Sequence, residues 1–137
     1  MRRNVRSAED EEGVATVEMA VIFPVSLLLV FSIVQLGVWY HAADVARAAA
    51  QEGVRAARVA GASAQSGADK ANQVLDDDAR GLLVNRRVIP SRDGDVARVE
   101  VSGRCVRIVP IPFLVLPIRA VAESPVERFR APQPAGG

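Results

Sequence analysis

The 137-residue chain is poor in the residues on which most catalytic and metal sites depend. It contains one cysteine, Cys105, one histidine, His41, and only 4% aromatic residues. A single cysteine forms no disulfide within the chain, and one histidine does not supply the ligand cluster that a zinc site needs. Cys105 and His41 also lack any motif that would orient them for nucleophilic catalysis. We therefore expect no enzymatic activity, no metal and no cofactor.

The chain also lacks an excess of charge of either sign. It has 17 Lys and Arg residues against 16 Asp and Glu residues, which gives a net charge of +1. This balance provides no basic field, and the few aromatic residues provide few platforms on which bases stack. We do not expect a nucleic acid partner.

Charge is nearly absent from one long segment. Residues 14–40 are almost entirely apolar, and no charged residue lies between Glu18 and Asp44. As a helix the segment measures about 40 Å, which exceeds the hydrocarbon core of about 30 Å. The apolar core of a cleaved secretory signal is shorter, about 7–15 residues. The sequence therefore predicts a transmembrane helix over 14–40, closed by the interfacial aromatic residues Trp39 and Tyr40.

The flanking charges predict the orientation of this helix. Arg2, Arg3 and Arg6 precede the span, and the first basic residue after it is Arg47. Basic residues accumulate on the cytoplasmic side. We expect a single-pass protein of the cytoplasmic (inner) membrane, with the N-terminus cytoplasmic and the part after Tyr40 outside.

The alanine-rich segment 41–60 predicts that the helix continues beyond the bilayer. Ala49, Gly53, Ala57 and Gly61 recur every four residues and form a ridge of small side chains. Such a ridge allows another backbone to approach closely. Its partner is either the chain's own outer domain or the helix of another subunit, and the sequence leaves both open.

The rest of the chain predicts a small domain of mixed structure, so the fold class is α+β. Residues 61–67 read as a linker, 68–130 as the domain and 131–137 as a disordered tail. Within the domain we expect a helix over about 68–83, then strands at 84–89, from 97 up to 109, and at 118–123. An Asp-Gly turn with positive φ angles should join the first two strands. The apolar segment 113–116 either fills the small core or lies on the membrane or on a partner.

The N-terminal half carries a recognisable series of motifs. It contains Gly13-Val14-Ala15-Thr16-Val17-Glu18-Met19, then Phe23-Pro24, Leu27-Leu28-Leu29 and Gln51-Glu52-Gly53-Val54-Arg55-Ala56-Ala57. This pattern resembles the TadE family of pseudopilins. The resemblance implies a pilin-like fold and a role in building or forming a Tad (tight adherence, Flp-type) pilus, or a related type II or type IV secretion apparatus. Pro24 would then mark a segment that melts on assembly, or else a tolerated kink.

The resemblance also implies how the protein is processed and with what it associates. Prepilin peptidase would remove the leader 1–13 by cutting between Gly13 and Val14, leaving Glu18 as the fifth mature residue. Other partners would be pilin-like subunits, the Tad assembly platform and the lipid bilayer. Glu18 would neutralise the new amino terminus of a neighbour, unless it lies only in the headgroup region. The alternative is an uncleaved single-pass anchor or scaffold whose outer domain binds another envelope protein.

Overall fold

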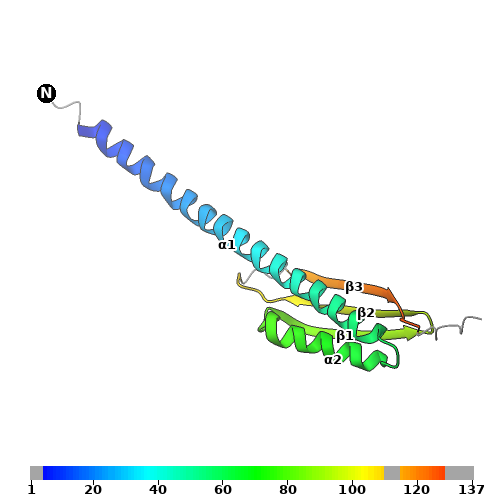
Figure 1. Cartoon of the computed structure of the whole chain (residues 1–137). Coiled ribbons are helices and arrows are strands. Elements are labelled where there is room, and N and C mark those ends of the chain that lie inside the picture. Colours follow the sequence, from blue (N-terminus) through cyan, green and yellow to red (C-terminus); the bar gives the residue numbers. More distant parts are fainter. Residues whose placement is uncertain (1–4, 110–114, 129–137) are drawn as a thin grey trace, which may run out of the picture.

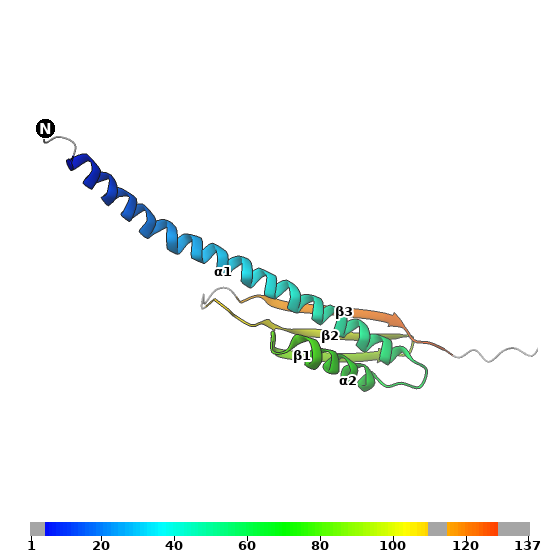
Figure 2. The same cartoon turned by 60° about the vertical axis from the view of Figure 1, so that its left-hand side comes forward.

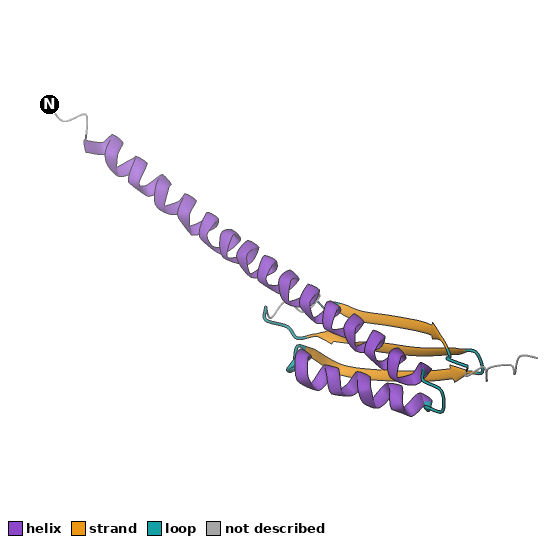
Figure 3. Cartoon of the chain, viewed as in Figure 1, coloured by secondary structure: helices purple, strands orange, loops and turns teal. Residues whose placement is uncertain are grey.

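A computed structural model describes residues 5–109 and 115–128, with side chains from residue 15 onward. Two helices and a helical turn precede three strands in the chain, which confirms the α+β class (Figures 1 and 3). The elements are α1 (Val5–Arg58), α2 (Ala64–Val74), the π-helical turn η1 (Leu75–Ala79), β1 (Leu83–Asp93), β2 (Val96–Cys105) and β3 (Pro117–Pro125).

The strands form an antiparallel sheet in the order β1-β2-β3, and both helices pack on one face of it (Figure 3). Alternation along the central strand determines this face. Ala97, Val99 and Val101 are fully buried toward the helices, while Arg98 and Glu100 lie on the opposite face. The helix side of the sheet is therefore the core of the domain.

The first strand is longer than predicted. It continues past Ile89 through Pro90 to Asp93. Pro90 has no N–H for a sheet hydrogen bond, but β1 is an edge strand and tolerates it. The hairpin turn lies at Gly94-Asp95, one residue beyond the predicted Asp-Gly pair, and Asp93 belongs to the strand, where it pairs with Val96.

The positive φ angles predicted for this turn are wrong. Gly94 has no positive φ, and the strand instead has one at Asn85 (φ 52°). Asn85 lies where the β1–β2 register shifts between Val84 and Arg87. Asn tolerates the left-handed conformation that a bulge residue adopts.

The predicted linker and second helix have different bounds in the structure. The hydroxyl of Ser63 accepts a hydrogen bond from the backbone N–H of Ser66 (3.2 Å), so α2 begins at Ala64 and residues 64–67 are helical rather than linker. The helical segment ends at Ala79, before the predicted Leu83, because Arg80 (φ 38°) and Gly81 (φ 84°) adopt left-handed conformations.

Helix α1 dominates the shape of the molecule. Its C-terminal half lies on the sheet beside α2, and its N-terminal half projects alone (Figures 1 and 2). Among the described residues, α1 is the one helix whose length and composition suffice to cross a membrane. The predicted tail 131–137, and residues 113 and 114 of the apolar segment, lie outside the described residues.

Candidate functional site

The projecting half of α1 presents an apolar surface with one charge. From Ala15 to Val34 every side chain is exposed except the half-buried Ser32, and Glu18 is the only charged residue among them. The hydroxyl of Ser32 donates to the carbonyl of Leu28 (2.7 Å), so this polar group is satisfied within the helix. The surface is suited to lipid or to other apolar helices.

The residues of the predicted processing motif lie on this projecting half. Gly13 and Val14 are within α1, and Glu18 follows about one turn later with an exposed side chain. Glu18 forms no hydrogen bond or ion pair with any other residue that the structure describes. A carboxylate so placed is available to a group from outside the chain.

The first buried side chain along the described part of α1 is one that the sequence analysis missed. Gln35 is only 1% exposed, although it follows directly on the bare apolar surface. Its Nε2 donates to the carbonyl oxygen of Val106 (3.0 Å), and its Oε1 accepts from the N–H of Ile108 (2.8 Å). The signal in the sequence was a single amide side chain inside a long apolar run.

These bonds explain why β2 ends before the predicted Val109. Beyond Cys105 the carbonyl of Val106 and the N–H of Ile108 bond to Gln35, whereas the N–H of Val106 still bonds to the carbonyl of Leu82 (2.8 Å). Cys105 itself is buried beside the Gln35 amide (Nε2 to Sγ, 3.8 Å), and burial raises the pKa of its thiol. We call Gln35 with the backbone of residues 106–108 the Gln35 clamp.

A second bond anchors the other side of the same connection. The indole Nε1 of Trp39 donates to the carbonyl oxygen of Pro117 (3.3 Å), at the start of β3. Trp39, predicted as an interfacial anchor, thus also contacts the outer domain. Leu116 packs against the core, whereas Val115 is 40% exposed, so these two residues of the apolar segment 113–116 differ.

The predicted ridge of small residues lies mostly inside the chain's own domain. Ala49, Gly53 and Ala57 are buried where α1 meets α2 and β2, and a β-carbon on Gly53 would meet the carbonyl oxygen of Gly67 at 2.7 Å. Gly61 is not part of this contact, because α1 ends at Arg58 and Gly61 is exposed in a turn (φ 82°).

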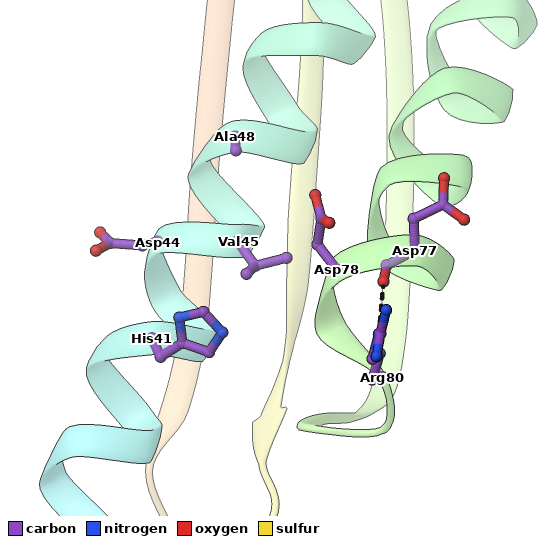
Figure 4. Close-up of a pocket in the computed structure, with 7 residues that line it drawn as sticks. All are labelled: His41, Asp44, Val45, Ala48, Asp77, Asp78 and Arg80. Carbon is purple, nitrogen blue, oxygen red and sulfur yellow. Dashed lines mark hydrogen bonds between the residues drawn. The ribbon is translucent and has the colours of Figure 1, made fainter.

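An open groove lies between α1 and the segment from η1 to Arg80 (Figure 4). Its volume is about 560 Å³, and its lining residues are His41, Asp44, Val45, Ala48, Asp77, Asp78 and Arg80. Asp44 pairs with Arg47 (2.7 Å), and Arg80 donates to the backbone carbonyl of Asp77 (3.2 Å). Throughout the part of the chain that the structure describes, no group of three or more His, Cys, Asp or Glu side chains could hold a metal ion.

A comparison with known proteins finds a match for the segment that contains the predicted processing motif and most of α1. Residues 13–55 match the family model described as "TadE-like protein". This segment is TadE-like. The match begins at Gly13, spans the bare apolar surface and Gln35, and ends within the buried part of α1. No curated protein and no solved structure matches the chain.

The TadE-like segment therefore joins two different environments along one helix. Its N-terminal part is exposed and apolar, and its C-terminal part forms the core of the domain with residues such as Ala46 and Ala49. A TadE-like match over such a helix fits a single-pass membrane protein of a pilus system.

Proposed function

We propose that this protein is a processed, pilin-like component of a Tad-type pilus, with a structural rather than a catalytic role. The observation that carries the proposal is the coincidence of three features: the TadE-like match starts at Gly13, the projecting half of α1 is apolar, and Glu18 is its only charged residue from position 15 to position 34. Its partners are prepilin peptidase, other pilin-like subunits and the Tad assembly platform.

The chemistry of the processed terminus supports a role in lateral assembly. Cleavage after Gly13 creates an α-amino group on Val14 whose ordinary pKa is about 8, so it is largely cationic at neutral pH. The unpaired ammonium of Val14 and the lone carboxylate of Glu18 would each be costly in the membrane. Pairing Glu18 with the amino terminus of a neighbouring subunit would remove both costs and favour one axial register.

The same segment supports the proposed topology. Placing the projecting half of α1 in the inner membrane leaves the leader with its arginines in the cytoplasm and the sheet outside. Prepilin peptidase would then reach the bond between Gly13 and Val14 at the cytoplasmic surface.

N-terminal sequencing of the membrane-extracted protein tests this function. A host with an active prepilin peptidase should yield a chain that begins at Val14, and Gly13→Leu should yield the uncut chain. A wild-type chain that retains Met1 or Arg2 would support the anchor or scaffold interpretation instead.

A further inference from the structure

We propose that the described ends of the connection between β2 and β3 lie on the outer leaflet of the bilayer, with phospholipid as their partner. The inference rests on the membrane placement of α1 but not on processing or pilus assembly. It concerns the described ends of this connection, residues 106–109 and 115–116.

The length of α1 places the Gln35 clamp at the lipid surface. The 20 residues from Ala15 to Val34 span about 30 Å of helix, the thickness of the hydrocarbon core. Trp39 and Tyr40 are residues of the outer interface, and Gln35 lies about 6 Å closer to the bilayer centre than Trp39. The residues bonded to Gln35 are therefore held at or just inside the outer interface.

The Gln35 clamp supplies what a loop needs in this environment. Backbone N–H and C=O groups that lose contact with water must bond to protein groups. The amide of Gln35 satisfies one of each, the carbonyl of Val106 and the N–H of Ile108. An apolar side chain at position 35 would leave both groups unpaired near lipid.

The surface of the connection matches a phospholipid layer. Ile108 and Val115 are 46% and 40% exposed, and the N–H of Ile108 bonds to Gln35, which directly follows the exposed apolar residues 15–34 of α1. Arg104 and Arg107 line an adjacent groove of about 380 Å³ and form no ion pair with any residue in the described ranges. Arginines at this height are placed to bind phosphate groups, next to side chains that enter the acyl region.

The arrangement of the fold supports the same placement. The connection emerges from the end of the sheet nearest the projecting half of α1, whereas the β1–β2 hairpin lies at the opposite end (Figures 1 and 2). The hairpin residues Asp93, Gly94 and Asp95 are charged or small, as expected at an end that faces water.

Fluorescence quenching in vesicles tests the proposal. The full chain, with Cys105→Ser, is reconstituted in phosphatidylcholine and phosphatidylglycerol and labelled with an environment-sensitive dye at Ile108→Cys. Val121→Cys is the matched control, because Val121 is 44% exposed but lies on the face of the sheet that points away from the helices. Leu29→Cys, on the projecting half of α1, reports whether the helix itself is in lipid.

We expect the label at position 108 to resemble that at position 29, with blue-shifted emission and quenching by nitroxides on the acyl chains. The label at position 121 should respond to aqueous iodide instead. Gln35→Leu should shift the position-108 label toward the response of position 121 and leave position 29 unchanged.

The result that overturns the proposal is iodide quenching at position 108 while position 29 remains in lipid. Shielding of position 108 from both quenchers would also overturn it, since a protein would then cover the connection, and loss of that shielding on dilution with lipid would identify a second copy. Iodide quenching at position 29 would show that the projecting half of α1 is not in lipid, which overturns the placement on which the proposal rests. Failed pilus assembly or leader cleavage changes none of these readouts.

Discussion

Gly53 of α1 and Gly67 of α2 face each other at a distance that leaves no room for a β-carbon on either. A β-carbon on Gly53 would lie 2.7 Å from the carbonyl oxygen of Gly67, and one on Gly67 would lie 2.8 Å from the carbonyl oxygen of Gly53. Backbone, rather than a flexible side chain, blocks each position. The two helices therefore pack at the closest approach that the chain permits.

This contact predicts that Gly53→Ala destabilises the outer domain. Although alanine favours helix by about 1 kcal/mol over glycine, the displaced backbone should cost about 1–3 kcal/mol, as overpacking of a core does. The measurement is the thermal unfolding midpoint of the full chain in detergent, followed by circular dichroism. Gly37→Ala is the control, because a β-carbon there meets nothing within 4 Å. Equal midpoints for the two variants would contradict the close approach.

A second prediction separates cleavage from assembly at Glu18. Glu18→Val should ease membrane insertion by at most about 3 kcal/mol, the cost of a charge at the helix centre, because a lone carboxylate near the end of the span is removed. Cleavage after Gly13 should persist, while crosslinking to other pilin-like subunits should fall, since the ammonium of Val14 loses its partner. Crosslinking at equal membrane levels is the measurement, with Met19→Val as the control that keeps the charge. If Glu18→Val associates as well as the wild-type chain, Glu18 does not pair with a neighbour and lies only in the headgroup region.

Topology provides a third prediction. Since the arginines of the leader precede the apolar span, a reporter that works only outside the cytoplasm should be active when fused after Gly137. The matched control is a fusion at the same position to a reporter that works only in the cytoplasm, and it should be silent. The reverse pattern would invert the proposed orientation.

A fourth prediction concerns the outer face of the sheet. Glu100 accepts a hydrogen bond from Nη2 of Arg119 (3.0 Å) and forms an ion pair with its Nε (2.8 Å). The hydrogen bond, with the charges of Arg119 and Arg98, lowers the pKa of Glu100 against the opposing effect of burial. A carboxylate with a lowered pKa stabilises the fold above its ordinary pKa of about 4.3, and this stabilisation is lost as the pH falls through the lowered value.

Glu100→Gln should therefore reduce the loss of stability on acidification below about pH 4.3. The check is the unfolding midpoint from pH 7 down to pH 3, compared with Glu123→Gln. Glu123 is a suitable control because it pairs with Arg98 (2.8 Å) but is more exposed than Glu100. A steeper acid dependence in Glu100→Gln than in the wild-type chain would reverse the predicted sign.

The sequence predicted those parts of the fold in which neighbouring residues determine the structure. The long helix follows from a continuous apolar and alanine-rich run, and the buried face of β2 follows from the alternation of Val99 and Val101 with Arg98 and Glu100. Local capping was harder to read. Ser63 moved the start of α2, because a hydroxyl that accepts one N–H outweighs the loop-like composition of the residues around it.

The contacts that depend on distant residues were not predictable from local patterns. Gln35 and Val106 are 71 positions apart, and nothing in either neighbourhood indicates that the two meet. The same holds for the ridge, where Ala49 and Gly53 are compatible with any close partner, whether α2 or another chain. The proposed processing motif is different, because Gly13, Val14 and Glu18 are recognised through the resemblance to the TadE family and would act on partners outside the chain.

The outer half of α1 is fastened to the sheet domain at both of its ends. At one end Gln35 and Trp39 hold the connection before β3, and at the other the carbonyl of Arg58 accepts a hydrogen bond from the N–H of Glu127 (3.0 Å), just after β3. These attachments are about 35 Å apart along the helix. Attachment at both ends opposes sliding and turning of α1 against the sheet. A piston movement or rotation imposed on the apolar half would therefore tend to carry the sheet with it.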